Sequence, residues 1–367
     1  MWGDISIAFL LAFVTAFVIT PYTIRLAKKV GAIDKPEKRR INKEPMPRLG
    51  GIAVIVGFLV SCTYLLTIMT LEHTFFPFGE EQYFQKLMGL LAAILVLAVF
   101  CIIDDIKGLP AIIKLIGQVL AAIIVVSVGI KIDNINIPFL EQTLNINNHI
   151  YVYIISVGWI VGITNAINLI DGLDGLSSGI TLISCFSLLI VFTMNRSPII
   201  SIILITALAG AIVGFMPYNM NPAKTFIGDT GAQFLGFSLA VISILGTAKT
   251  YTLLVLISPL IILAIPIADT IFAIFRRIIK GKSFKAIFAP DTGHLHHKLV
   301  AKGFTQKQAV LILYGLSASL GMFAIILFDS GIWKALSFLL MIIAAVALGY
   351  RNFIKEKQTK PKLIDNK

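Results

Sequence analysis

Long apolar runs recur along the whole chain and constrain its fold more than any other feature. Each run holds roughly 20 residues, which as an α-helix can cross the hydrocarbon core of a bilayer. The runs lack the alternation of polar and apolar residues that a lipid-facing barrel strand needs, so we predict helices with internally satisfied backbone groups. We predict about eleven such spans, which begin near Ile5, Leu49, Leu87, Ala111, Ile150, Leu176, Ile199, Ala232, Leu253, Gln308 and Trp333.

The composition supports the same class of protein. Hydrophobic residues make up 57% of the chain and charged residues 14%, and the mean hydropathy is +0.91. These values lie far outside the range of soluble domains, so we predict an all-α, polytopic integral membrane protein. Residues 1–350 are expected to form a single transmembrane catalytic domain, followed by a basic cytoplasmic tail at 351–367. The first span lacks a basic n-region and a cleavage site, so we keep it as a membrane span.

Basic residues indicate how the spans are oriented. Lys and Arg collect on the cytoplasmic side of a membrane, and here they are concentrated in the loops after the first and ninth spans and in the C-terminal tail. We therefore predict an outside N-terminus and a cytoplasmic C-terminus. The net charge of +12 reflects this bias, and we expect no nucleic-acid partner. The predicted cytoplasmic loops lie near 27–48, 104–110, 171–177, 218–230 and 276–307.

The three cysteines, Cys62, Cys101 and Cys185, fall inside predicted spans. They do not have the spacing of metal ligands, so we predict that they are packing residues.

Polar clusters lie at the ends of predicted spans, where ionisable groups are usually functional. The clusters contain, in chain order, Asp104, Asp171, Asp229 and His294, and each is separated from the next by two membrane crossings. They therefore share one face of the membrane whichever way the chain is inserted. The basic loops make this the cytoplasmic face.

The pair Asp104 and Asp105 closes the third span. A helix C-terminus already carries partial negative charge, so two carboxylates there break a local preference. Adjacent like charges raise a pKa or recruit a cation, and violations of local rules tend to mark functional sites. The alternative is a solvated aspartate pair near Lys107.

A second polar group closes the fifth span. Asn165, Asn168 and Asp171 are spaced by three, a drift of only about 60° per step on an α-helix, so they form one polar stripe. Gly172 and Gly175 then end the helix and allow the backbone to approach a ligand closely. Alternatively, these residues merely shape a turn before the next span.

Asp229 lies between Gly228 and Gly231 at the start of the eighth span. It can be a helix N-cap. With the other acidic clusters on the same face, however, it suits Mg²⁺, which takes one or two carboxylates plus phosphate oxygens and water. Mn²⁺ can take the same place. Phe226, just upstream, can lie under a base or be an ordinary interfacial aromatic.

His294, His296 and His297 are three of the five histidines in the chain. Zinc binding is one alternative, but no cysteine is near and the spacing is not that of a closed structural site. An exposed polar loop is another. A phosphate-binding loop fits better, since imidazoles can donate hydrogen bonds to phosphoryl oxygens. Together the clusters indicate phosphoryl transfer, where catalysis is mostly positioning and charge neutralisation.

These motifs resemble the polyprenyl-phosphate N-acetylhexosamine-1-phosphate transferases, which are related to the phospho-N-acetylmuramoyl-pentapeptide transferases. The resemblance covers almost the whole chain, and within the family it is greatest to the bacterial undecaprenyl-phosphate N-acetylglucosamine-1-phosphate transferases. The matching motifs are, in order, "MPRLGG" at 46–51, "DD" at 104–105, "NAINLIDGLDGL" at 165–176, "NPAKTFIGDTG" at 221–231, "PIADT" at 266–270 and "GHLHHKL" at 293–299.

The resemblance implies a reaction and a location. UDP-N-acetylglucosamine and undecaprenyl phosphate would give undecaprenyl-pyrophosphoryl-N-acetylglucosamine and UMP at the cytoplasmic face of the bacterial cell (inner) membrane. This is the first membrane step of surface polymers such as teichoic acids and the O-antigens of lipopolysaccharide. Which polymer is made, which hexosamine epimer is preferred and whether the chain forms a homodimer stay open.

The resemblance also implies roles for individual residues. Asp229 would be the principal Mg²⁺ ligand, and Asp104 and Asp105 would handle the lipid phosphate or the metal, one of them as a base if a base is needed. The other implied site residues are Asn168, Asp171 and Asp174 beside the nucleotide and metal, Asn219 and Phe226 near uridine, His294, His296 and His297 on the pyrophosphate or sugar, and Arg48 and Lys38 as weaker phosphate contacts.

Two departures and one open residue qualify the match. Many relatives continue the aspartate pair as DDxxD, but here Gly108 stands at the fifth position, so a third carboxylate is not available. The run "GHLHH" differs from the "HHH" of the muramoyl-pentapeptide branch, which favours an N-acetylhexosamine donor. Asp269, about two turns inside the ninth span, is either a structural partner or a catalytic residue.

Two other functions compete with this interpretation. Transfer of phospho-N-acetylmuramoyl-pentapeptide to the same lipid is the alternative within the enzyme class. An ion-coupled transporter is the alternative from another class, but its binding groups should lie near the bilayer midplane on repeated, broken helices. Here they gather at one face, and we find no internal repeat.

Overall fold

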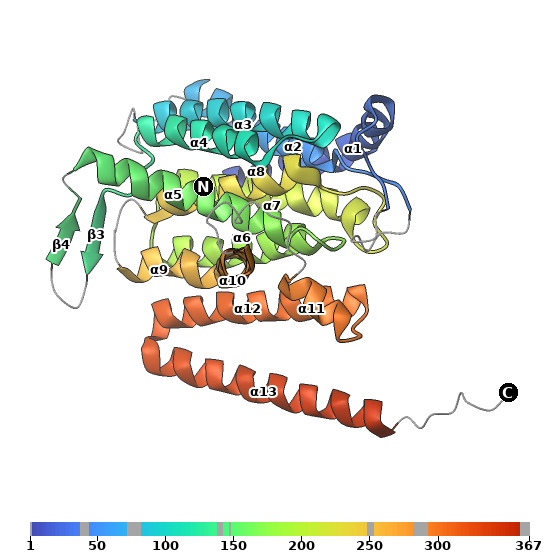
Figure 1. Ribbon diagram of the computed structural model, residues 1–367. Coiled ribbons are helices and arrows are strands. Elements are labelled where there is room, and N and C mark those ends of the chain that lie inside the picture. Colours follow the sequence, from blue (N-terminus) through green and yellow to red (C-terminus); the bar gives the residue numbers. More distant parts are fainter. Residues whose placement is uncertain are drawn as a thin grey trace.

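The computed structural model describes residues 2–36, 44–71, 82–137, 142–146, 148–247, 253–281 and 293–359. Across them the chain forms thirteen α-helices and two small antiparallel hairpins (Figure 1). The helices are α1 (Trp2–Val30), α2 (Gly50–Leu71), α3 (Gln82–Lys107), α4 (Ala111–Ser127), α5 (His149–Ile170), α6 (Leu176–Met194), α7 (Ile199–Asn219), α8 (Gly228–Thr247), α9 (Leu253–Ile262), α10 (Ala264–Gly281), α11 (Leu295–Ala301), α12 (Gln306–Ser330) and α13 (Ile332–Thr359). The strands are β1 (Ile33–Asp34), β2 (Met46–Pro47), β3 (Asn134–Ile137) and β4 (Gln142–Asn145).

The predicted spans are present as helices in the predicted order, which confirms the all-α polytopic class. Among the described residues, eight helices are long and apolar enough to cross a membrane: α1, α2, α3, α5, α6, α7, α8 and α12. Helix α4 and the first part of α13 are apolar but shorter. The ninth predicted span is divided into α9 and α10 near Leu263, in a region that contains Pro259 and Pro266, because proline weakens a helix ladder.

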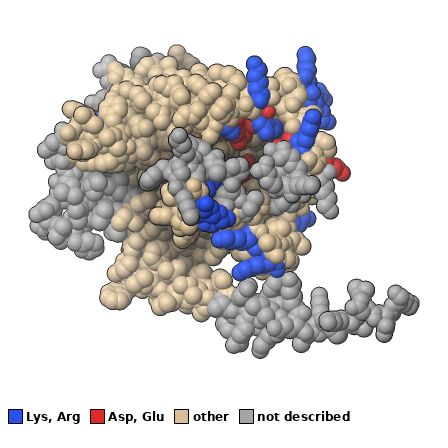
Figure 2. Space-filling model, in the orientation of Figure 1, with Lys and Arg blue, Asp and Glu red and all other residues tan. Residues whose placement is uncertain are grey.

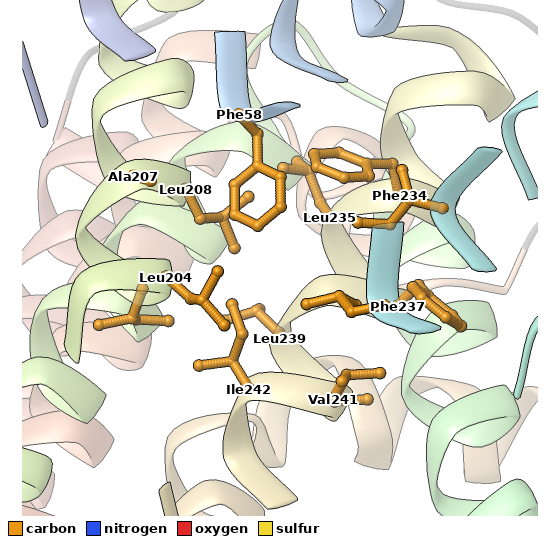
Figure 3. Packing of buried hydrophobic residues seen from close by; sticks show 14 of the residues in the cluster. Phe58, Leu204, Ala207, Leu208, Phe234, Leu235, Phe237, Leu239, Val241 and Ile242 are labelled. Atoms are coloured by element: carbon orange, nitrogen blue, oxygen red, sulfur yellow. The ribbon is translucent and has the colours of Figure 1, made fainter. Parts of the chain in front are cut away.

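Helix α8 forms the centre of the bundle. Every residue from Thr230 to Thr247 is buried, and α8 packs against α2, α3, α5, α6 and α7. Figure 3 shows how side chains from α2 and α7 surround it, and the rings of Phe58 and Phe234 meet edge to face with centroids 5.5 Å apart. A helix that is apolar on all sides belongs inside a bundle. The first turn of α8, which carries Asp229, is therefore held on the most enclosed element of the fold.

Small residues let α1 approach this core closely. Ala8, Ala12 and Ala16 are fully buried on α1, and Gly210 and Gly214 of α7 contact backbone atoms of α1. Such small-residue contacts are the usual basis of helix packing in membranes.

All three cysteines are free and buried, and they belong to the main hydrophobic cluster. The prediction that they are packing residues is confirmed.

Candidate active site

A cavity of about 770 Å³ opens at the end of the bundle where α3, α5 and α7 end and α8 begins. Figure 2 shows acidic atoms in a hollow, with Lys and Arg side chains gathered beside it. The acidic residues that line the cavity are Asp34, Glu44, Asp105, Asp171, Asp174 and Asp229. The fold thus brings together carboxylates from four separate parts of the sequence.

Asp105, at the end of α3, caps the start of α8. Its Oδ1 accepts a hydrogen bond from the Asp229 N–H (3.0 Å), and its Oδ2 accepts from the Thr230 N–H (2.9 Å) and hydroxyl (2.6 Å). The first N–H groups of a helix have no partner within it, so a carboxylate there is stabilising. Helix α8 begins at Gly228, earlier than the predicted Ala232. Asp229 is therefore not the N-cap; its backbone N–H is instead one of the groups that Asp105 caps.

Arg48 follows β2 and contacts the C-terminal end of α3. Its Nε donates to the Asp105 carbonyl oxygen (3.0 Å) and lies 3.3 Å from the Asp105 carboxylate, and its Nη2 donates to the Asp104 carbonyl oxygen (3.1 Å). Arg48 also lines the cavity. Two of its five N–H donors are used in these backbone contacts, so its predicted contact with phosphate depends on the face turned to the cavity.

Asp104 is almost completely buried and pairs with Lys114 of α4. The Lys114 Nζ lies 2.5 Å from Oδ2 of Asp104 and 2.5 Å from Oδ2 of Asp229. The other Asp104 oxygen accepts from the Leu109 N–H (2.6 Å). We did not predict Lys114 because it lies within an apolar run. The signal that was available is that a lone lysine in such a run is costly unless it has a partner.

The turn after α5 presents Asp171 to the cavity. Its Oδ1 accepts from the Ser177 hydroxyl (2.6 Å). Burial raises the pKa of the Asp171 carboxyl to about 7; the Ser177 hydrogen bond opposes this, and the negative charge of Asp229 adds to it. Two carboxylates that line one cavity therefore repel each other in the absence of a cation.

Asp174 and Asn219 hold the loop between α7 and α8. Asp174 Oδ2 accepts from Asn221 Nδ2 (2.8 Å) and from the Ala223 N–H (3.2 Å). Asn219 accepts from the Ser178 hydroxyl (2.9 Å) and donates to the Thr225 carbonyl oxygen (3.1 Å). Asp174, Asn219 and Asn221 line the cavity, and so does Phe226.

Asp269 of α10 holds the first of the three histidines, His294. His294 Nδ1 lies 2.8 Å from Asp269 Oδ2, and the Leu295 N–H donates to Asp269 Oδ1 (3.0 Å). This geometry identifies Asp269 as the partner of His294. Of the three histidines, His297 lines the cavity.

His296 is buried against Gly172 of the turn after α5. Among the described residues neither of its ring nitrogens has a hydrogen-bond partner. Burial, together with the neighbouring His297 and His294, lowers the pKa of His296 to about 3. The ring therefore stays neutral near pH 7 and packs the α11 segment against the cavity wall.

Four of the predicted site residues that the structure describes do not line this cavity. Three of them, Asp104, His294 and His296, are buried outside its lining. Asn168 lies in the last turn of α5, half-buried and outside the cavity lining. Lys38 lies outside the described residues.

The carboxylates that line the cavity suit Mg²⁺ if phosphate oxygens and water supply its other ligands. Within the described parts of the chain, no three His, Cys, Asp or Glu side chains converge as a ready-made metal cage. Mg²⁺ does not need one, because it usually binds one or two carboxylates and completes its shell with phosphate oxygens and water. Asp171 and Asp229 supply two carboxylates at an open cavity. The absence of thiolate and paired imidazole ligands among the lining residues does not favour zinc.

Comparison with known proteins identifies the family. The family model described as "Glycosyl transferase family 4" matches residues 87–247, which run from α3 to the end of α8. The "Probable undecaprenyl-phosphate N-acetylglucosaminyl 1-phosphate transferase" of Bacillus subtilis (strain 168) is 37% identical over 359 residues, covering 96% of this chain and 94% of the relative. The chain belongs to glycosyl transferase family 4.

Two further relatives are similar over most of their length. The "Decaprenyl-phosphate N-acetylglucosaminephosphotransferase" of Mycobacterium leprae (strain TN) is 30% identical over 341 residues, covering 85% of this chain and 80% of the relative. The "Phospho-N-acetylmuramoyl-pentapeptide-transferase" of Desulfitobacterium hafniense (strain DSM 10664 / DCB-2) is 29% identical over 360 residues, covering 91% of this chain and all of the relative. As a family 4 member with a bundle of apolar helices, the chain is a multi-pass membrane enzyme that transfers a sugar phosphate.

Proposed function

We propose that this enzyme transfers N-acetylglucosamine 1-phosphate from UDP-N-acetylglucosamine to undecaprenyl phosphate. The observation that carries the proposal is the likeness to the Bacillus subtilis relative, which extends over 96% of the chain and so includes every element that lines the acidic cavity. The lower identity to the pentapeptide transferase supports the N-acetylglucosamine donor.

The proposed reaction exchanges one phosphoanhydride for another. An oxygen of the lipid phosphate bonds to the β-phosphorus of the nucleotide sugar, and the bond from that phosphorus to the oxygen of the α-phosphate breaks. UMP leaves with the bonding electrons. Because the lipid phosphate is ionised at pH 7, no side chain has to remove a proton from it. The protein then acts mainly by positioning the two phosphates and neutralising their charge.

Residues around the cavity supply these functions in the proposal. Asp229 and Asp171 would hold Mg²⁺, which when bound neutralises charge on the phosphate oxygens. His297 lines the cavity and can donate to a phosphate. Asn219 and Phe226 also line the cavity, and we assign them to the uridine contact.

The proposal places the cavity at the cytoplasmic face. Lys28 and Lys29 in the last turn of α1, Lys107 in the last turn of α3 and Lys280 in the last turn of α10 support this orientation. Lysine at the ends of membrane helices favours the cytoplasmic side. The N-terminus is then outside and the C-terminus inside, in the bacterial cell membrane.

Purified enzyme in detergent tests the donor directly. We expect UMP release when undecaprenyl phosphate is supplied with UDP-N-acetylglucosamine and MgCl₂, and no release when excess chelator is added. Release only with the UDP-N-acetylmuramoyl-pentapeptide donor would support the alternative transferase. Release with neither donor, together with solute uptake in proteoliposomes, would support a transporter.

A further inference from the structure

The carboxylate of Asp105 is occupied entirely by other parts of the protein. Its two oxygens accept three hydrogen bonds from Asp229 and Thr230 and lie beside the Arg48 guanidinium at 3.3 Å. A carboxylate has about four acceptor positions, so these four contacts fill it. The residue is 3% exposed although it borders the cavity.

This geometry distinguishes Asp105 from Asp104. A base or a metal ligand needs a lone pair directed at the substrate or the ion. The lone pairs of Asp105 are instead directed at the first N–H groups of α8, which have no partner within their own helix. Asp104 pairs with Lys114, which also contacts Asp229.

Arg48 makes the reciprocal contact with the end of α3. Its guanidinium donates to the carbonyl oxygens of Asp104 and Asp105, where a cation is favoured by the helix dipole. We name the contacts among Arg48, Asp105 and Thr230 the cross-cap. The C-terminus of α3 and the N-terminus of α8 are thus capped by residues that also pair with each other.

Backbone contacts bring the start of α2 to the same point. The Gly50 and Gly51 N–H groups donate to the Phe226 and Ile227 carbonyl oxygens (3.1 and 2.8 Å). A side chain on Gly51 would collide with the backbone of Gly231. The cross-cap is therefore built into a junction of three helix ends that has little freedom to shift.

We propose that Arg48 and Asp105 are positioning residues that fix the first turn of α8 and, through it, the carboxylate of Asp229. The Asp229 N–H is itself one of the capped groups, so release of the cap lets this carboxylate move. The inference rests on the proposed function in one respect: it takes Asp229 to be a ligand of the metal ion. The cap itself is a property of the protein without substrate.

Hydrogen exchange on the purified, substrate-free enzyme tests the cap. In Asp105→Asn, the peptide that contains Asp229 and Thr230 should exchange about tenfold faster, since at least one charge-assisted hydrogen bond is lost. Thr230→Val removes only the hydroxyl bond and should give a smaller increase, whereas Thr230→Ser should match the wild type. This matched pair keeps the test informative if Asp105→Asn does not fold. Unchanged exchange in both Asp105→Asn and Thr230→Val would overturn the proposal.

Mn²⁺ binding, measured by electron paramagnetic resonance without substrate, separates positioning from ligation. If Arg48 and Asp105 are positioning residues, both Arg48→Lys and Asp105→Asn should weaken Mn²⁺ binding. Lysine cannot form the forked contact that Arg48 makes. Weaker binding in Asp105→Asn with wild-type binding in Arg48→Lys and Thr230→Val would instead make Asp105 a ligand. Ser243→Ala, which alters the α5–α8 contact with Trp159 far from the cavity, is the control.

The pH profile of UMP release gives the last readout. A positioning residue lowers the rate without changing the shape of the profile, so Asp105→Asn should keep its acid limb. Loss of that limb would identify Asp105 as a base and contradict the proposal. If no variant and no wild-type preparation releases UMP, the proposed function fails, but the exchange and Mn²⁺ results still decide on the cross-cap.

Discussion

Lys114 Nζ lies 2.5 Å from Oδ2 of Asp229, a residue 115 positions later in the chain. The same ammonium lies 2.5 Å from Asp104, so one cation on α4 joins the end of α3 to the start of α8. Lys114 and Asp229 are 28% and 30% exposed, and a divalent ion at Asp229 would compete with this ammonium.

Lys114→Met should therefore leave two acidic groups without their cation. We expect a lower melting temperature in detergent, corresponding to about 1–2 kcal/mol after allowance for solvent screening. Added Mg²⁺ should raise the melting temperature of the variant more than that of the wild type. Lys131→Met, which removes a 3.7 Å pair with Asp133 of similar exposure, is the control and should show neither effect. Equal Mg²⁺ shifts in variant and wild type would contradict this account.

Asp171 would give the proposed metal site a pH dependence. Its folded pKa of about 7 lies above its ordinary value of 3.8, so its contribution to stability is complete below pH 3.8 and is lost as the pH rises through 7. A cation needs the ionised form, so metal binding should release protons and become tighter between pH 6 and 8. Mn²⁺ titrations at pH 6, 7 and 8 measure this change.

The matched variant for this effect is Asp171→Asn. It should bind Mn²⁺ more weakly at pH 8 and lose most of the dependence on pH. A wild-type affinity that is constant from pH 6 to 8 would show that Asp171 does not take part in metal binding.

The buried ring of His296 predicts a loss of stability in acid. Its folded pKa of about 3 lies below its ordinary value of 6.5, so its contribution is present above pH 6.5 and is lost as the pH falls toward 3. At about 1.4 kcal/mol per pH unit, the loss should reach about 2 kcal/mol between pH 6.5 and 5. Melting curves of the wild type and of His296→Gln over this range test the effect.

The variant His296→Gln should flatten the acid dependence, because glutamine does not titrate. His149→Gln, at the exposed start of α5, is the control and should retain the wild-type dependence. If both variants behave alike, another group is responsible for the acid sensitivity.

The sequence predicted the helices well because their signal is local. Length and hydropathy locate each span without reference to the others. The divided ninth span was not predicted, because proline is tolerated within membrane helices and Pro259 and Pro266 do not by themselves mark a break. Helix α11 was also missed, since its seven residues lie in a polar segment with no long apolar pattern.

The contacts within the site were harder to predict because they join distant positions. Asp105 meets Asp229 across 124 residues, and Lys114 meets Asp229 across 115. Parity of crossings placed the acidic clusters, but not Lys114, on one face, and the structure does bring Asp105, Asp171 and Asp229 to one cavity. Nothing in the residue types, however, distinguishes a carboxylate that caps a helix from one that is open to a ligand.

Beneath the cavity, a chain of buried and half-buried amides connects α4, α5 and α8. Gln118 Nε2 donates to Gln233 Oε1 (2.9 Å), and Asn165 Nδ2 donates to Gln118 Oε1 (2.6 Å). These positions lie one helical turn below Lys114 and Asp229. Within the described residues Gln233 Nε2 has no acceptor, so the side chain of Gln233 depends on Gln118, whereas Asn165 Nδ2 also donates to the Val161 carbonyl oxygen (2.8 Å).

Gln118→Leu should destabilise the protein by about 1–3 kcal/mol, because it leaves the buried amide oxygen of Gln233 without its donor and removes one of the two acceptors of Asn165 Nδ2. Adding Gln233→Leu removes one of those atoms, so the double variant should lose less stability than the sum of the two single variants. Combining Gln118→Leu with Ser243→Ala, an independent contact with Trp159 on α5, should instead be additive. Melting temperatures of all five variants in one detergent measure the coupling, and strict additivity in both pairs would mean that the amides do not act as a unit.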